Sequence, residues 1–366
     1  MAGSSWGTLL RMTTWGESHG SGLGAVVDGC PAGLPLCEED IQRYLDRRRP
    51  GQSRYTTKRQ EADRAEILSG VFEGKTTGTP ISILVRNTDQ RSRDYSEIMN
   101  LYRPGHADYT FDQKYGFRDY RGGGRSSGRE TIGRVAAGAV AAKLLQELGV
   151  EVIAYARSIG PVEADMGRFD REEIGRNPVC MPDAEAAAKA EAYLQEQMER
   201  QDSAGGVVEC VIRGLPAGVG EPVFEKLDAC LGHALLSIGA VKGVEIGDGF
   251  AAAASTGSVN NDMFYIKDGH GAKRTNHAGG ILGGISDGSD VVIRAAFKPT
   301  PSIARPQRTI TRQGEETEAV IRGRHDPIIV PRAVVVVEAM AAFTAADLLL
   351  QGLSSRLDSV RRALGR

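Results

Sequence analysis

The sequence Gly29-Cys30-Pro31-Ala32-Gly33 recurs as Gly214-Leu215-Pro216-Ala217-Gly218, with both glycines and the Pro-Ala pair in the same places. Glycines at every fourth position in 70–78 precede an apolar segment, and the same run recurs at 280–288 before another apolar segment. Because these repeats keep their order along the chain, they favour an internal duplication, in which two related halves pack against each other.

Apolar patterning predicts short strands and a few long helices in each half. An alanine-rich helix after Arg134 has a counterpart after Arg332, which is a third repeated block. Strands are predicted at 8–13, 23–27, 81–85, 150–156, 207–212 and 291–297, and helices at 38–48, 131–149, 183–200, 221–238 and 331–352. A hairpin is predicted at 308–321, and the Gly-rich stretches 115–128 and 256–280 are predicted to lack regular structure.

The predicted fold class is α+β, with internally duplicated βαβ-type sandwich halves whose short, mostly antiparallel strands surround central helices. We expect one domain over 1–366. Its pseudo-repeat halves are expected at roughly 1–155 and 205–355, joined by the helical segment 183–200. Since ligands bind preferentially between packed units, we expect the ligand site between the halves.

Composition excludes several classes of protein. Of the 366 residues 41% are apolar and 25% charged, as in an ordinary folded chain, and the net charge is −2. No global basic field directs the chain to nucleic acid or to a membrane. No apolar run reaches about 18 residues, and residues 1–11 lack the apolar stretch of a signal peptide. The five cysteines are irregularly spaced, so we expect free thiols in a reducing cytoplasm and no built-in metal.

Charge is unevenly distributed along the chain. Residues 43–64 contain eight basic and three acidic side chains, and residues 294–332 contain eight basic and four acidic ones. The segment 121–129 places arginines among glycines and serines just before a predicted helix. Glycine amides, hydroxyls, a helix N-terminus and bidentate Arg donors together suit a phosphate group. A flexible linker is the alternative for 121–129 and a solvated face for the basic run near 46–54, but this composition favours anion binding.

Five of the six histidines lie in loops rich in Gly or bounded by Pro, where packing explains them poorly. His19 lies in Gly16-Glu17-Ser18-His19-Gly20, and His106 lies in the segment 103–108. His233 falls in a predicted helix and is interpreted as structural. The residues alone therefore predict a site rich in Arg and His for one or more polyanions, without naming a reaction.

Common catalytic motifs do not supply that reaction. The serine-hydrolase pattern Gly-x-Ser-x-Gly occurs four times, and the copies at 16–20 and 124–128 lack the required strand-then-helix context. No P-loop is present, and no Gly-x-Gly-x-x-Gly opens a βαβ unit.

Seven blocks resemble the chorismate synthase family, in the family's order and over essentially the whole chain: Gly16-Glu17-Ser18-His19-Gly20, 47–58, 103–108, 122–138, 276–284, 298–302 and 323–331. The resemblance implies a carbon–oxygen lyase that converts 5-enolpyruvylshikimate 3-phosphate to chorismate and phosphate, the last step of the shikimate pathway. It also implies an anti-1,4-elimination that needs reduced FMN without net redox change. A substrate with one phosphate and two carboxylates agrees with the clustered arginines.

The resemblance implies roles for individual residues. His19 corresponds to the acid that protonates the departing phosphate, His106 to a proton donor or acceptor at the reduced flavin, and Asp326, with Ser18, to the group that assists flavin nitrogen 5. Implied FMN contacts are Arg125, Ser126, Ser127, Gly239, Ala240, Gly283, Lys298, Pro299, Thr300, Pro301, Ser302 and Arg324. Implied substrate ligands are Arg48, Arg54, Arg103 and Arg129, of which the first two are linked to a nicotinamide dinucleotide in some relatives. No metal is implied, and NADPH is expected only as an indirect reductant.

Three positions depart from the family pattern: Gly239 stands where relatives often carry Asn, Pro301 where Ser is frequent and Ile328 where Cys is common. The length matches the short, monofunctional bacterial type, so we expect a separate flavin reductase, and the resemblance implies a homotetramer. Two other classes remain open. One is an ordinary flavin oxidoreductase. The other is an RNA-binding module, which predicts exposed aromatic platforms that the Arg-rich segments mostly lack.

Overall fold

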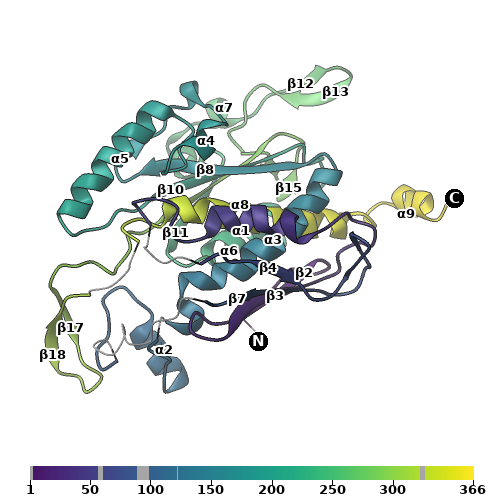
Figure 1. The fold of residues 1–366 in the computed structure, drawn as a ribbon. Helices are drawn as coiled ribbons and strands as arrows, with labels where there is room; N and C mark the ends of the chain where they lie inside the picture. Colours follow the sequence, from purple (N-terminus) through teal and green to yellow (C-terminus); the bar gives the residue numbers. More distant parts are fainter. Residues whose placement is uncertain (1–2, 57–60, 89–98, 122, 322–325) are drawn as a thin grey trace.

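The computed structural model describes residues 3–56, 61–88, 99–121, 123–321 and 326–366. Two antiparallel five-stranded sheets enclose a layer of helices, which confirms the predicted α+β class (Figure 1). The first sheet has the order β1 (Ser5–Trp6), β2 (Arg11–Gly16), β3 (Gly22–Asp28), β7 (Ile81–Arg86) and β4 (Ala65–Ile67). The second has the order β11 (Val241–Ile246), β16 (Val291–Phe297), β10 (Gly206–Arg213), β8 (Glu151–Ile159) and β9 (Val162–Glu163).

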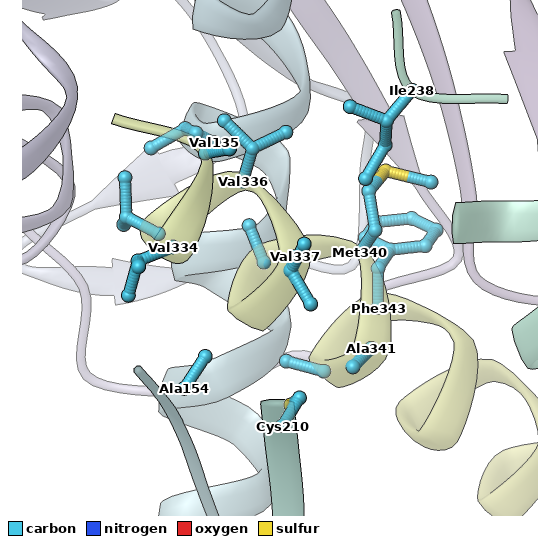
Figure 2. Close-up of a cluster of buried hydrophobic side chains, with 14 of the residues drawn as sticks. Val135, Ala154, Cys210, Ile238, Val334, Val336, Val337, Met340, Ala341 and Phe343 are labelled. Carbon is cyan, nitrogen blue, oxygen red and sulfur yellow. The ribbon is translucent and has the colours of Figure 1, made fainter. Parts of the chain in front are cut away.

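The helix layer supplies most of the core. Its helices are α1 (Glu38–Arg48), α3 (Thr131–Glu147), α6 (Leu227–Leu236) and α8 (Val330–Gly352). Helix α3 packs against β3 of the first sheet, and α8 packs against β8 and β10 of the second. In Figure 2, Val135 of α3 and Met340 and Phe343 of α8 lie in one apolar cluster with Ala154 and Cys210 from the second sheet. Helix α8 is long and apolar enough to cross a membrane, but most of it is buried inside the protein, as expected of a core helix.

Helices α3 and α8 lie side by side through small residues. A Cβ placed on Gly138 of α3 would lie 2.3 Å from the Cβ of Ala339 in α8. Both helices begin at the same end of the layer, because Arg48 at the end of α1 contacts the side chain of Thr131 and accepts a hydrogen bond from Arg332. The two helix N-termini therefore converge on one place.

The two sheets repeat one arrangement. The strand order β2-β3-β7-β4 in the first corresponds to β8-β10-β16-β11 in the second. In the first sheet the Thr76 hydroxyl donates to the carbonyl of Pro31 at 2.6 Å and accepts from the amide of Leu34. In the second, the Ser286 hydroxyl donates to the carbonyl of Pro216 at 2.6 Å and accepts from the amide of Val219. The pentapeptides and glycine runs that repeat in the sequence thus build the same hydroxyl clamp twice.

Most predicted elements form, with shifted ends. Helix α1 has the predicted bounds, whereas α6 begins at Leu227, six residues later than expected. Strand β2 begins at Arg11 rather than at residue 8. Helix α5 (Ala184–Glu199) is capped by Asp183, whose carboxylate accepts from two backbone amides. In the sequence α5 lies between β9 and β10, which both belong to the second sheet, so α5 does not connect the two sheets. Strand β8, which spans residue 155, also belongs to the second sheet.

The prediction of no regular structure at 256–280 is wrong. The segment contains α7 (Gly257–Asn260) and a hairpin of β12 (Phe264–Lys267) and β13 (His270–Lys273). Asp268 and Gly269 at its turn both have positive φ, 51° and 81°. An Asp-Gly pair at the tip is the usual signal for a tight hairpin, and the surrounding glycines obscured it.

The remaining short elements lie at the edges of the sandwich. The segment that carries His106 leads into α2 (Asp108–Tyr115), and it contacts the predicted hairpin of β17 (Gln307–Ile310) and β18 (Glu316–Ala319) through a bridge between Leu101 and Thr311. In Figure 1 these elements form a lobe beside the sandwich. The other elements are β5 (Val71–Phe72), β6 (Lys75–Thr76), β14 (Ile281–Leu282), β15 (Ile285–Ser286), α4 (Glu173–Arg176) and α9 (Leu357–Ala363).

Candidate active site

Arg48 lies at the centre of a buried ion cluster, where α1 ends and α3 and α8 begin. Its side chain is 1% exposed, and it donates to a carboxylate oxygen of Asp63 at 2.6 Å and to the hydroxyl of Thr131 at 3.1 Å. Burial and the positive charge of Arg332 together lower the pKa of Arg48 to about 9, although the negative charge of Asp63 opposes both effects. Arg48 therefore remains charged at neutral pH, and it lies beside two other arginines.

The other two arginines complete the cluster. Arg129, 5% exposed, forms ion pairs with Glu61 and Asp63 at 3.3 and 3.2 Å. Arg332, in the first turn of α8, donates to Asp326 at 2.6 Å. Three guanidinium groups and two helix N-termini therefore face one region, and both features favour bound anions.

The His19 loop is tied to this cluster by Asn87, the residue after β7. The Asn87 side-chain amide donates to the carbonyls of Glu17 and Gly20 at 2.9 and 2.8 Å, and its oxygen accepts from Arg129 at 2.7 Å. Within the loop the Ser18 hydroxyl lies 3.2 Å from Nδ1 of His19. His19, Ser18 and Arg129 are thus brought together.

His106 is placed by the segment that follows β16. Its Nε2 lies 2.7 Å from the hydroxyl of Ser302, and Lys298 donates from Nζ to the carbonyl of Gly105 at 2.7 Å. The backbone amide of Lys298 donates to Ala240 at 3.0 Å, which brings Ala240 into the same group. Five of the predicted site residues thus form a second group beside the second sheet: Ala240, Lys298, Pro301, Ser302 and His106.

A continuous path of contacts joins this second group to the ion cluster. The hydroxyl of Ser203 donates to the carbonyl of Thr300 at 2.7 Å, and the amide of Ala204 donates to the carbonyl of Pro327 at 3.1 Å. Pro327 follows Asp326, which pairs with Arg332. The hydroxyl of Thr300 is buried, and no hydrogen-bond partner for it exists in the described part of the chain.

The Gly-rich segment before α3 is engaged with the first sheet. Arg125 donates to the carbonyl of Gly16 at 3.1 Å and to the hydroxyl of Thr14 at 2.7 Å. The hydroxyl of Ser126 donates to Gly123, and that of Ser127 accepts from the amide of Arg129. This segment therefore lies directly beside Arg129; within it Gly124 is buried, whereas Ser126 and Gly128 are exposed.

Several predicted residues are not in either group. Arg54 is 62% exposed, pairs with Glu191 of α5 at 3.1 Å and stacks on Tyr55. Gly283 lies at the turn between β14 and β15, before β16 begins, whereas Lys298 follows the end of that strand. At about 3.3 Å per residue the two ends of β16 are roughly 20 Å apart. Arg324 lies outside the described residues.

Arg103 has its charge neutralised within the chain. It forms a bidentate pair with Asp108 at 2.7 and 2.8 Å, and both side chains are 7% exposed. Burial raises the pKa of Asp108, but the hydrogen bonds and charge of Arg103 outweigh it and lower that pKa below its usual value. The pair closes the turn that contains His106, so Arg103 stabilises the loop that carries this histidine.

The sequence analysis missed Asn87, Asp63 and Glu61. Asp63 and Glu61 were visible only as the few acids within a basic run, and such carboxylates are the natural partners of buried arginines. Nothing local marks Asn87, because its partners lie 42 and about 70 positions away in the sequence.

A cavity of about 590 Å³ lies elsewhere, between β1, α6 and the C-terminal half of α8. Trp6, Cys230, His233 and Asp347 line it, and none of the predicted site residues does. The convergence of charged groups, and not the size of a cavity, therefore locates the candidate site. Among the side chains that the structure describes, no group of three or more His, Cys, Asp or Glu is placed to hold a metal ion.

Comparison with known proteins finds relatives over almost the whole chain. The sequence model of the chorismate synthase family matches residues 10–350. A chorismate synthase of Agathobacter rectalis is 64% identical over 360 residues, which cover 98% of each chain. One of Lachnoclostridium phytofermentans is 63% identical over 363 residues, 99% of each chain. A crystal structure of a chorismate synthase superposes with a TM-score of 0.77 at 34% identity, over 98% of this chain and 97% of the other.

Proposed function

The chain belongs to the chorismate synthase family, and we propose that its reaction takes place where Arg48, Arg129 and Arg332 meet the His19 and His106 loops. The enzyme is a carbon–oxygen lyase of the shikimate pathway, in which 5-enolpyruvylshikimate 3-phosphate gives chorismate and phosphate. The observation that carries the proposed location is the cluster of three arginines at two helix N-termini, in which Arg48 and Arg129 are buried and Arg332 is partly exposed.

The arginine cluster binds the anionic groups of the substrate. A phosphate and two carboxylates require several fixed cations, and guanidinium groups match such groups with paired hydrogen bonds. The carboxylates of Asp63, Glu61 and Asp326 hold the three arginines in place before substrate arrives. Binding then needs little rearrangement of the charged groups.

His19 acts as the acid for the departing phosphate. The Ser18 hydroxyl beside Nδ1 orients the imidazole, and Asn87 fixes the backbone on both sides of it. A dianionic leaving group close by favours the protonated ring, which is the form that can donate. Arg129, bound to the same Asn87, stabilises the negative charge that develops on the phosphate.

The residues of the second group suit reduced FMN. Lys298 to Ser302 offer hydroxyls and amides, including the buried hydroxyl of Thr300, and a side chain at Gly239 would meet no atom within 4 Å. We assign the isoalloxazine ring to His106, Ser302 and Ala240, and the cofactor phosphate to the segment of Arg125, Ser126 and Ser127. Reduced FMN, when bound, supplies electron density to the substrate ring and a place for the proton that leaves it.

The chain's own residues move protons around that group. Nε2 of His106 lies 2.7 Å from the Ser302 hydroxyl, so a proton can pass along this hydrogen bond. Arg332 holds the carboxylate of Asp326 at 2.6 Å, and this partly exposed carboxylate can accept a proton and release it to solvent. Ser18, whose hydroxyl lies beside His19, assists in this proton transfer.

The remaining expectations follow the family. The five cysteines are free, which suits a reducing cytoplasm. We propose a homotetramer that receives reduced FMN from a separate flavin reductase, with NADPH as the indirect electron donor. Of the other implied residues, Pro299, Pro301, Gly283 and Arg324 belong to the proposed FMN contacts, and Arg54 and Arg103 to the proposed substrate ligands. Gly283 and Arg54 lie outside both groups of residues within one chain, and we propose that another subunit of the tetramer brings them to the site.

The decisive experiment measures stoichiometry under strictly anaerobic conditions. Purified enzyme receives a small amount of chemically reduced FMN and an excess of 5-enolpyruvylshikimate 3-phosphate, while chorismate and flavin absorbance are followed together. We expect many chorismates per FMN, with the flavin still reduced at the end. One flavin oxidised for each product would identify an ordinary flavin oxidoreductase instead.

A further inference from the structure

Asn87 uses every hydrogen-bonding group of its side chain. Its oxygen accepts from Nε and Nη2 of Arg129 at 3.1 and 2.7 Å. Its amide nitrogen donates to the carbonyls of Glu17 and Gly20 at 2.9 and 2.8 Å. The backbone amide of Asn87 also donates to Ser21 at 3.2 Å. One side chain therefore connects the arginine cluster to both ends of the turn that carries Ser18 and His19.

The support of Asn87 is itself rigid. It directly follows β7, which lies between β3 and β4 in the first sheet. The next residue, Thr88, donates from its backbone amide to Glu61 at 3.2 Å, and Glu61 also pairs with Arg129. Asn87 therefore holds Arg129 directly, and Thr88 holds it through Glu61. A shift of the His19 turn relative to Arg129 requires the Asn87 bonds to break.

We propose that Asn87 is the positioning residue that fixes His19 relative to Arg129. This inference rests on the proposed function, in which Arg129 binds an anionic group of the substrate and His19 protonates the phosphate that leaves. Asn87 touches neither substrate nor cofactor in this scheme. It acts through the distance between an anion-binding group and an acid, and a displacement of about 1 Å in such a pair can cost about 100-fold in rate.

Asn87→Asp separates the two functions of the side chain. A carboxylate still accepts from Arg129, but it has no hydrogen to donate to Glu17 and Gly20, and it places negative charge against their carbonyl oxygens. A matched control is Asn177→Asp in the loop before α5. The Asn177 amide also donates to two backbone carbonyls, those of Glu173 and Met181, both at 2.8 Å. The control loses the same kind of bonds, and none of the described partners of Asn177 is a residue of the proposed site.

The expected result is a selective loss of turnover. We expect Asn87→Asp to lower kcat about 10- to 100-fold and to change the substrate KM by less than about 3-fold, because Arg129 keeps its partner. Asn177→Asp keeps wild-type kcat. When His19 is already replaced by Ala, Asn87→Asp lowers kcat by less than about 3-fold more, because its effect passes through His19. Should the Asp variant fail to fold, Asn87→Ala tests the same bonds without the added charge.

Two kinetic outcomes overturn the inference: wild-type kcat in a folded Asn87 variant, or an equal loss of kcat with and without His19. The ring signals of His19, followed by NMR in the free enzyme with labelled histidine and assigned with His19→Ala, provide a readout that needs no turnover. They shift in Asn87→Asp if Asn87 positions the ring, and unchanged signals contradict the proposal. A wild-type enzyme that forms no chorismate would instead contradict the proposed function, and the NMR comparison would still decide the role of Asn87.

Discussion

Arg48 and Arg103 show that similar arginines can serve different purposes in one site. Both are buried and both are paired with an aspartate. Arg48 has only one oxygen of Asp63 and lies beside two further arginines, so its surroundings remain favourable to an added anion. Both oxygens of Asp108 accept from Arg103, so besides its proposed contact with substrate Arg103 also stabilises the turn that contains His106. The sequence alone does not distinguish Arg48 from Arg103, because the residue type does not show which distant carboxylate each arginine pairs with.

The two loop histidines give a direct test at this scale. We expect His19→Ala and His106→Ala each to lower kcat about 10²- to 10⁴-fold, the usual contribution of a general acid or base. His233→Ala is the control, since His233 packs edge-on against Trp6 at 4.6 Å in the cavity beside α6. Its kcat should stay at the wild-type value. Turnover that survives in either loop variant, measured anaerobically with excess reduced FMN, would remove that histidine from the mechanism.

The contact between α3 and α8 decides whether the helix layer can form. Gly138→Ala puts a methyl group 2.3 Å from Ala339, and neither backbone can yield without moving the helices apart. We expect a loss of about 1–3 kcal/mol in the free energy of unfolding, as for other overpacked cores. The measurement is urea denaturation followed by circular dichroism.

Gly232→Ala is the matched control for that variant. Gly232 lies inside α6, and no atom lies within 4 Å of where its Cβ would be. Here alanine should raise the free energy of unfolding by up to about 1 kcal/mol, because it favours helix over glycine. If both variants are equally stable, the close helix contact is not what limits the packing of the layer.

The elements that sequence patterns identified are those whose signals are local. Helix α5 has an aspartate cap followed by alanines, and α8 begins with a proline in its first turn, so both could be found without knowledge of the fold. The first residues of α6 could not, since Pro222 and the acidic residues beside it resemble a helix start but form a turn before Leu227. The partners of Asn87 and Arg48 depend on how strands and helices from distant segments meet, and no spacing within the sequence encodes that meeting.

At the scale of the whole molecule, we propose that the chain arose by duplication of a unit with one sheet and its helices. The repeated strand order and the two hydroxyl clamps support this proposal. Because β8 belongs to the second sheet, we place the boundary between the two units near Gly149, in the turn between α3 and β8, and not at residue 155. The helix α5 would then be an insertion within the second unit.

The two clamps should contribute equally and independently to stability. Thr76→Val and Ser286→Ala each leave the buried amide of Leu34 or Val219 without its partner, which costs about 1–3 kcal/mol. Because the clamps belong to different sheets, the double variant should lose the sum of the two values to within about 0.5 kcal/mol. Thr77→Val, at an exposed neighbour, is the control. A clamp whose loss changes nothing in the denaturation midpoint would contradict their equivalence.

The position of α8 in the chain has a consequence for biosynthesis. This helix fills the centre of the sandwich, yet it begins only at Val330 of 366 residues. At about 5–20 residues per second, a ribosome needs roughly 20–60 s to reach it. After β8 and β10 have been synthesised, the part of the second sheet that α8 covers in the folded protein still lacks that helix, and apolar side chains such as Ala154 and Cys210 stay open to solvent or to chaperones until α8 follows. The core can therefore be completed only after α8, the last long helix of the chain, has left the ribosome.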